Sequence, residues 1–128
     1  MKAAYIDTSS VLAVYLQEPG HQRVLDALHE YEEIASSSLL EAELRSAMHR
    51  EGFESPDLDI LDRLVWVFPN RSLSAEISMV LSAGYLRGAD LWHLACALYF
   101  RGSHPEVQFL SLDRRQLEVA GILGLSLL

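Results

Sequence analysis

The sequence predicts an α/β fold of three layers, in which helices cover both faces of a mostly parallel sheet. Short apolar runs of strand length alternate along the chain with longer segments whose apolar residues recur at helical spacing. This alternation is typical of β–α–β units, which build parallel sheets. Half of the 128 residues are apolar and 22% are charged, as in a globular protein with a core of its own. The length predicts a single domain over residues 1–128.

The first half of the chain begins with a strand. Residues 3–6 form an apolar run too short for a helix, and Asp7, Thr8 and Ser9, which follow it, are residues that cap helices. Pro19 and Gly20 break the helical pattern, and Ser55 with Pro56 is a typical helix start. The other elements expected here are helices over residues 10–17, 21–31, 39–51 and 56–63 and strands over residues 34–35 and 65–68.

The second half repeats the pattern. Pro69 and Asn70 turn the chain after the third strand, and Gly88 and Ala89 precede a strongly apolar helix that opens at Asp90. The elements expected here are helices over residues 73–84, 90–100 and 113–123 and strands over residues 107–112 and 125–128.

Two acids directly follow predicted strands. Asp7 comes after the first strand and Asp113 after the strand at 107–112. If these strands are parallel, both carboxylates lie at the edge of the sheet where ligands bind in such folds. Each acid is also explained as the N-cap of the next helix, and Asp113 with Gln116 has the spacing of a capping box. The pattern leaves both interpretations open.

Two further acids lie on helices. Glu43 has Leu39, Leu40 and Ala47 as helical neighbours, so it is expected on a largely apolar face, whereas Glu41 faces Arg45 on a polar side. A partly buried charge is costly unless it is paired or holds a metal. Asp90, in the first turn of an apolar helix, is explained either in the same way or by the helix dipole.

Together, the four acids predict a divalent metal site. Carboxylates are the ligands that Mg²⁺ and Mn²⁺ prefer. Clustered without a metal, they would repel one another and raise each other's pKa values. We therefore expect Asp7, Glu43, Asp90 and Asp113 to bind Mg²⁺ or Mn²⁺, which can activate water and neutralise charge on a phosphoryl group.

Charge and composition exclude several other classes. The net charge of −8 argues against a protein that coats nucleic acid through a broad basic face. Lys2 is the only lysine, which argues against a phosphotransfer receiver, and the chain has neither a Gly-Lys-Ser/Thr phosphate loop nor a Gly-x-Gly dinucleotide motif. Cys96 is the only cysteine, so a disulfide framework is excluded. No apolar run reaches the roughly 20 residues of a membrane helix, and a cytoplasmic location is expected.

Four segments resemble PIN domains, in the same order and at similar spacing. They are residues 5–10 (YIDTSS), 37–45 (SSLLEAELR), 86–98 (LRGADLWHLACAL) and 109–116 (FLSLDRRQ). The third is similar to the corresponding segment of the VapC-type toxins and is the most specific. Ser111 stands where many relatives have Thr, and both side chains offer a hydroxyl.

The resemblance implies a metal-dependent endoribonuclease that acts as the toxin of a type II toxin–antitoxin pair. It implies Asp7, Glu43, Asp90 and Asp113 as the catalytic, metal-binding acids, with Asp113 the most variable in its role. It also implies an RNA substrate, a cognate antitoxin protein and a homodimer. The alternative is a non-catalytic PIN-like interaction domain whose acids are helix caps.

Several other residues near the acids in sequence, or in apolar segments, have structural interpretations as surface charges or core residues. Arg45, Arg87, Arg114 and Arg115 lie near the acids in sequence and are candidates for RNA contacts, although arginine is most often a surface charge. His93, three residues after Asp90, could support the site but is interpreted as a core histidine. Cys96 is interpreted as an unreactive core thiol, and Trp66 and Trp92 as packing residues.

Overall fold

The computed structural model describes residues 2–128. It has a five-stranded sheet in the order β3-β2-β1-β4-β5, and all four neighbouring pairs are parallel. The strands are β1 (Ala3–Ile6), β2 (Glu33–Ser37), β3 (Val65–Val67), β4 (Gln108–Leu110) and β5 (Ser126–Leu127). The helices are α1 (Thr8–Leu16), α2 (His21–Leu28), α3 (Leu39–Arg50), α4 (Ile60–Arg63), α5 (Ser74–Ala83), α6 (Gly88–Arg101) and α7 (Arg114–Ile122).

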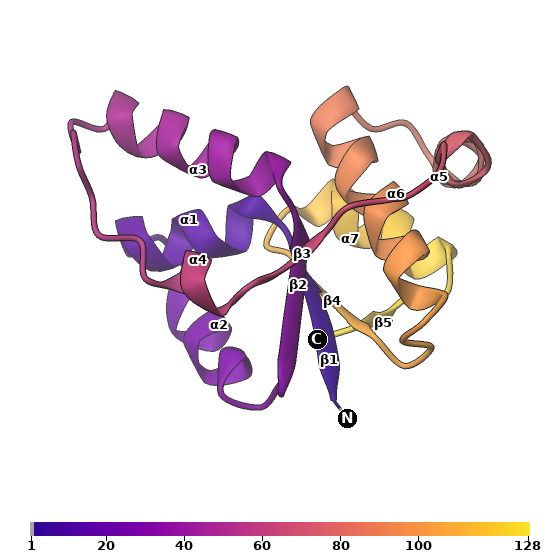
Figure 1. Ribbon diagram of the computed structural model, residues 1–128, viewed down its shortest axis with the longest axis horizontal. Coiled ribbons are helices and arrows are strands. Elements are labelled where there is room, and N and C mark those ends of the chain that lie inside the picture. Colours follow the sequence, from indigo (N-terminus) through magenta and orange to yellow (C-terminus); the bar gives the residue numbers. More distant parts are fainter. Residues whose placement is uncertain (1) are drawn as a thin grey trace.

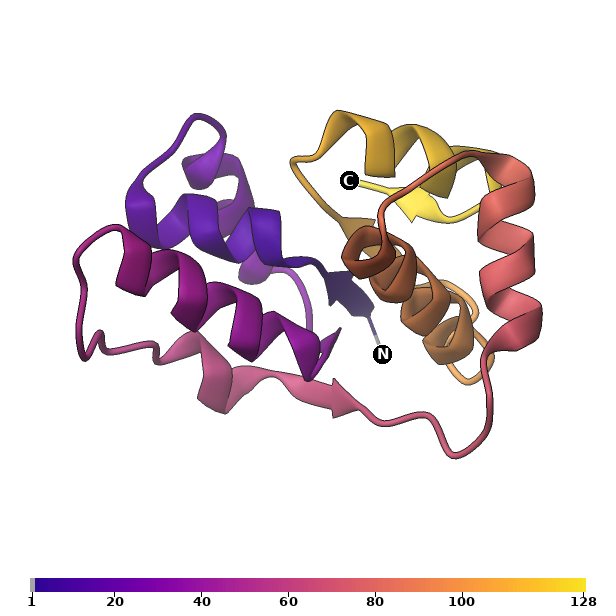
Figure 2. The same cartoon turned by 90° about the horizontal axis from the view of Figure 1, so that it is seen from above.

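Helices lie on both sides of the sheet, which confirms the predicted three-layer α/β fold. In Figure 1 the strands are seen between α1, α2, α3 and α4 on one side and α5, α6 and α7 on the other, and Figure 2 shows the two groups from above. The central strand β1 explains this arrangement. Ala3 and Tyr5 point into the core beneath α6 and α7, while Ala4 and Ile6 point into the core beneath α1 and α3. A strand buried on both faces needs a continuous apolar run, as β1 has.

The strand order reverses at β1. The chain moves outward from β1 through β2 to β3, then returns to place β4 on the other side of β1. Ligands of open parallel sheets bind outside the carboxyl ends of the strands at such a switch point. Here that point is formed by the residues that follow β1 and β4, and the amide of Asp7 donates to the carbonyl of Leu110 across it, with 3.1 Å between nitrogen and oxygen.

Two predicted helices are shorter than expected: α2 ends at Leu28 instead of residue 31, and α4 lacks the start predicted for it. Ser55 and Pro56 were expected to start α4, but it begins only at Ile60. The phenolic oxygen of Tyr15 accepts a hydrogen bond from the amide of Ile60 at 3.1 Å, and its hydroxyl donates to Asp59 at 2.8 Å. A side chain from α1 therefore satisfies the start of α4, and Leu58 turns into the core before it.

None of the helices in residues 2–128 is both long and apolar enough to cross a membrane.

Candidate active site at the carboxyl ends of the strands

Asp7 lies at the switch point and is almost fully buried, with 3% of its surface exposed. The hydroxyl of Ser9 lies 2.9 Å from both carboxylate oxygens, and the hydroxyl of Ser111 donates to Oδ2 at 2.8 Å. The amide of Ser10 donates to Oδ1 at 3.2 Å, so Asp7 caps α1 as expected. Burial raises the pKa of Asp7, while the bonds from Ser111, Ser9 and the Ser10 amide oppose that rise.

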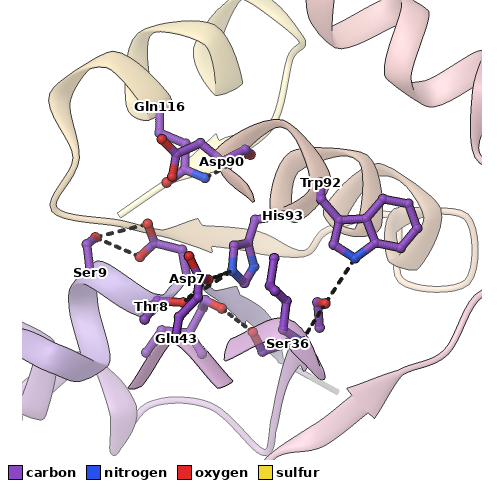
Figure 3. Close-up of polar contacts among 12 residues, drawn as sticks. Asp7, Thr8, Ser9, Ser36, Glu43, Asp90, Trp92, His93 and Gln116 are labelled. Carbon is purple, nitrogen blue, oxygen red and sulfur yellow. Dashed lines mark hydrogen bonds and ion pairs between the residues drawn. The ribbon is translucent and has the colours of Figure 1, made fainter. Parts of the chain in front are cut away.

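Glu43 lies on α3 and turns toward Asp7, as the close-up in Figure 3 shows. Its side chain is 31% exposed. Oε1 accepts a hydrogen bond from the hydroxyl of Thr8 at 2.7 Å and lies 2.9 Å from Nε2 of His93. Burial raises the pKa of Glu43, but the hydrogen bonds from His93 and Thr8 outweigh burial and leave the pKa below its usual value.

Asp90 is half-buried in the first turn of α6. Its pKa is raised, first by burial and then by the negative charge of Asp113, with a smaller rise from Glu43 that Arg87 opposes. The carboxylates of Asp113 and Glu43 are therefore close enough to disfavour the ionised form of Asp90.

Asp113 is the N-cap of α7, because its Oδ1 accepts from the amide of Gln116 at 3.0 Å. The side chain of Gln116 does not complete the capping box. It donates instead to the carbonyl of Asp90 at 3.2 Å, and its amide oxygen lies 3.1 Å from the hydroxyl oxygen of Ser111, whose single proton goes to Asp7. The fully buried Gln116 thus ties the start of α7 to the start of α6.

The four acids share one end of the sheet but form two linked pairs. Thr8 and His93 connect the surroundings of Asp7 to Glu43, and Gln116 connects Asp90 to Asp113 (Figure 3). Over residues 2–128, no three His, Cys, Asp or Glu side chains lie close enough together to hold a metal ion. Within the same residues, neither an arginine nor a lysine forms an ion pair with any of the four acids.

Comparison with known proteins identifies the family. The family model of the PIN domain matches residues 4–122, nearly the whole chain. The chain belongs to the PIN domain family. Proteins with PIN domains are generally nucleases that use divalent metal ions, so the family gives this chain a nuclease-type fold. No curated protein matches the sequence.

The four candidate arginines of this PIN domain differ in whether their guanidinium groups form ion pairs on the surface. Arg45 pairs with Glu41 at 2.7 Å, as the sequence predicted, and Arg115 binds Glu118 at 3.2 Å and the carbonyl of Tyr85 at 3.3 Å. Both side chains are therefore engaged on the surface. Arg87 is the N-cap of α6 and Arg114 is the first residue of α7. Both are exposed at the site, which makes them the better candidates for phosphate contacts.

The interpretation of His93 as a core histidine was incomplete. Its side chain is buried, with 1% exposed, but both of its ring nitrogens contact residues that line the site of the PIN domain. The spacing from Asp90 to His93 was the available signal. Nothing in the sequence indicated Tyr5, whose hydroxyl lies 2.9 Å from Nδ1 of His93, because alternation only placed it in the core.

The other assignments outside the site agree with the structure. Cys96 is buried, and burial raises the pKa of its thiol to about 12, so the thiolate is not available at neutral pH. The indole of Trp92 packs against the core of the PIN domain and donates to the hydroxyl of Ser37 at 3.1 Å. Trp66 packs against the core on the opposite face of the sheet.

Proposed function

We propose that this PIN domain is a metal-dependent endoribonuclease that cleaves RNA phosphodiester bonds as the toxin of a type II toxin–antitoxin pair. One observation carries the proposal. The pKa of Asp90 is raised, first by burial and then by the negative charges that Asp113 and Glu43 place beside it at the switch point of the sheet. A fold gains no stability from like charges held together, and a bound cation would remove their repulsion.

The donor set fits Mg²⁺ or Mn²⁺. Asp7, Glu43 and Asp90 would hold the ion, and Asp113 would complete the set or orient the attacking water. All of these ligands are hard carboxylate oxygens, as both ions prefer. When bound, the ion lowers the pKa of a water molecule and neutralises charge on the phosphoryl group. Within residues 2–128, no three of these acids lie close enough together to form a complete metal site with their side chains as they stand.

The chain's own side chains hold the acids for this role. Hydroxyls of Ser9 and Ser111 orient Asp7 without neutralising it, and Thr8 with His93 orients Glu43. None of these donors carries the permanent positive charge of a lysine or arginine, so the carboxylates stay available for a cation.

The RNA substrate, the cognate antitoxin, the homodimer and the cytoplasmic location are part of the same proposal. They rest on the resemblance of residues 86–98 to the VapC-type toxins and on membership of the PIN family. Exposed Arg87 and Arg114 are the side chains proposed to meet RNA phosphates.

The proposal is tested by calorimetric titration of Mn²⁺ into the metal-free protein, followed by cleavage assays on RNA with Mg²⁺, with Mn²⁺ and with EDTA. We expect saturable Mn²⁺ binding and RNA cleavage that EDTA abolishes. Glu43→Gln and Asp90→Asn should each weaken metal binding at least about tenfold, as loss of a charged ligand does.

Glu41→Gln is the matched control, because Glu41 lies two residues before Glu43 on α3 and pairs with Arg45 outside the site. It should bind Mn²⁺ and cleave RNA like the unaltered chain. Equal losses in Glu41→Gln and Glu43→Gln would mean that overall charge, rather than a defined site, attracts the ion.

One observation favours a second candidate, a non-catalytic interaction domain. Asp7 and Asp113 both serve as N-caps, a structural role that accounts for an acid at each position. If the folded protein neither binds Mn²⁺ nor cleaves RNA, this second function replaces the first.

A further inference from the structure

We infer that His93, oriented by Tyr5, is a positioning residue that fixes the carboxylate of Glu43 in the candidate site. The inference rests on the proposed nuclease function, because it assigns His93 a role in that same site. It is carried by a continuous chain of hydrogen bonds that runs from the backbone of β2 through Tyr5 and His93 to Glu43.

The first link is the hydroxyl of Tyr5, which is fully buried on β1. Its oxygen accepts a hydrogen bond from the amide of Ser37 at 3.1 Å. An amide can only donate, so the hydroxyl proton of Tyr5 is free to donate to Nδ1 of His93, 2.9 Å away. Nδ1 is therefore an acceptor and carries no proton in this arrangement.

The other side of the ring gives the same answer independently. The hydroxyl of Thr8 donates its single proton to Oε1 of Glu43 at 2.7 Å, so its oxygen can only accept from Nε2 of His93, 3.2 Å away. Oε1 of Glu43, a carboxylate oxygen, also accepts from Nε2 at 2.9 Å. Both partners require the proton on Nε2, so one tautomer of His93 satisfies every contact of the ring.

The opposite tautomer would be costly here. It would turn a lone pair of Nε2 toward a carboxylate and leave the protons of Tyr5 and Nδ1 facing each other. A buried polar group left without a partner lowers the stability of the folded protein. The edge-on packing of the two rings, with centroids 6.0 Å apart and planes at 72°, holds the histidine in place for the bond to Glu43.

The consequence for the site is a fixed direction for Glu43. Among the described residues, both hydrogen bonds to this carboxylate fall on Oε1, which leaves Oε2 available for another ligand. α3 carries Glu43 and α6 carries His93, and the two helices belong to opposite layers. His93 thus sets the position of Glu43 relative to Asp90, because Asp90 lies one helical turn before His93 on α6.

Two substitutions separate this role from mere packing. In His93→Gln the amide nitrogen occupies the place of Nε2 and can still donate to Glu43, but the acceptor for Tyr5 is lost. In His93→Asn the amide oxygen occupies the place of Nδ1 and can still accept from Tyr5, but the donor for Glu43 is lost. Both variants bury one neutral amide in place of the imidazole ring. A purely structural role of His93 therefore predicts similar losses of Mn²⁺ affinity and RNA cleavage in both variants.

The first measurement is made on the unaltered chain without metal or RNA. Two-bond ¹H–¹⁵N correlation spectra of ¹⁵N-labelled protein report the protonated nitrogen of each histidine, and His93→Gln identifies the signal of His93. We expect the ring proton on Nε2, the nitrogen that faces Glu43. A proton on Nδ1 would overturn the inference whatever the enzyme activity proves to be.

The second measurement compares Mn²⁺ affinity by calorimetry and RNA cleavage in the unaltered chain and the two variants. We expect His93→Asn to lower Mn²⁺ affinity and kcat about tenfold or more, as removal of a partner of a metal-binding carboxylate does, while His93→Gln keeps most of both. KM for RNA should change little in either, because His93 is buried and does not reach the substrate.

The outcomes distinguish this inference from the proposed function. One outcome is that the unaltered chain binds Mn²⁺ and cleaves RNA while His93→Asn and His93→Gln lose Mn²⁺ affinity and kcat equally or not at all. In that case the positioning role is wrong, and the proposed nuclease function is kept. If the unaltered chain does neither, the proposed function is wrong and the positioning role falls with it. A selective loss in His93→Asn supports both.

Discussion

At the scale of single residues, Asp90 shows most directly that the candidate site is built against its own stability. Its carboxylate is half-buried beside two other acids, and no lysine or arginine within residues 2–128 forms an ion pair with it. A structural role for this acid would rest on the dipole of α6, in whose first turn it lies.

We therefore expect Asp90→Asn to stabilise the metal-free protein at pH 7, by roughly 0.5 kcal/mol because solvent screens a half-exposed charge. The raised pKa means that ionisation of Asp90 opposes folding, so the penalty grows as pH rises through the folded-state pKa and is absent where the carboxyl is protonated in both states. The gain should vanish below about pH 3, where the carboxyl is protonated in the unfolded chain as well. Urea unfolding at both pH values measures it.

Glu41→Gln is the control for this experiment too. It also removes a first-turn acid, but one that pairs with Arg45, so it should lower stability by roughly 0.3–0.5 kcal/mol. If Asp90→Asn instead lowers the free energy of unfolding by about 1 kcal/mol, the residue stabilises the start of α6 and the repulsion argument is wrong.

At the scale of elements, the boundaries depend on partners that lie far away in sequence. Gly20, with φ at 91°, separates α1 from α2, as Pro19 and Gly20 predicted from local chemistry. The start of α4 was predicted wrongly because its partner, the hydroxyl of Tyr15, comes from α1. A short helix has little stability of its own and follows such tertiary contacts.

Tyr15→Phe should accordingly lower the free energy of unfolding by about 1 kcal/mol, since it removes one donor to Asp59 and one acceptor for the amide of Ile60. Amide hydrogen exchange should rise selectively in α4. Tyr85→Phe is the control, because Tyr85 is 71% exposed and should change neither quantity. Equal exchange in α4 of Tyr15→Phe and the unaltered chain would show that the hydroxyl does not stabilise this start.

At the scale of the whole molecule, the charge distribution limits how RNA can bind. The net charge is −8, and the arginines that flank the site without being held in a surface ion pair are Arg87 and Arg114. RNA binding should then depend on the metal and on a few contacts instead of on a broad basic face.

We expect the salt dependence of RNA affinity in EDTA to be shallow. For single-stranded RNA and two phosphate contacts, the slope of log K against log salt should be about −1.4. Fluorescence anisotropy of a labelled oligonucleotide measures it. The double variant Arg87→Gln/Arg114→Gln should flatten the slope toward zero, whereas Arg45→Gln should leave it unchanged. A slope steeper than about −4 would require a basic surface that these residues do not form.

Local sequence patterns determined the fold class, the helix caps and the identity of the candidate acids. The three-layer fold followed from strand-length apolar runs alternating with helical ones, because alternation of this kind has few compact solutions. The caps at Asp7 and Asp113 followed from residue type and position, and the ion pair of Glu41 with Arg45 from helical spacing. The four candidate acids could be named because each stands at the end of a strand or the start of an apolar helix face.

Only the tertiary structure decided how those residues meet. In the folded chain, Ser111 contacts Asp7 across the switch point, and the side chain of Gln116 donates to the backbone of Asp90. Tyr5 contacts His93, and His93 contacts Glu43, through hydrogen bonds between residues more than 30 positions apart. The periodicity of apolar residues predicts which side chains face the core, as it did for Tyr5 and His93. It cannot say which buried polar group satisfies which, because hydrogen-bond partners are set by the packing of layers that are distant in sequence.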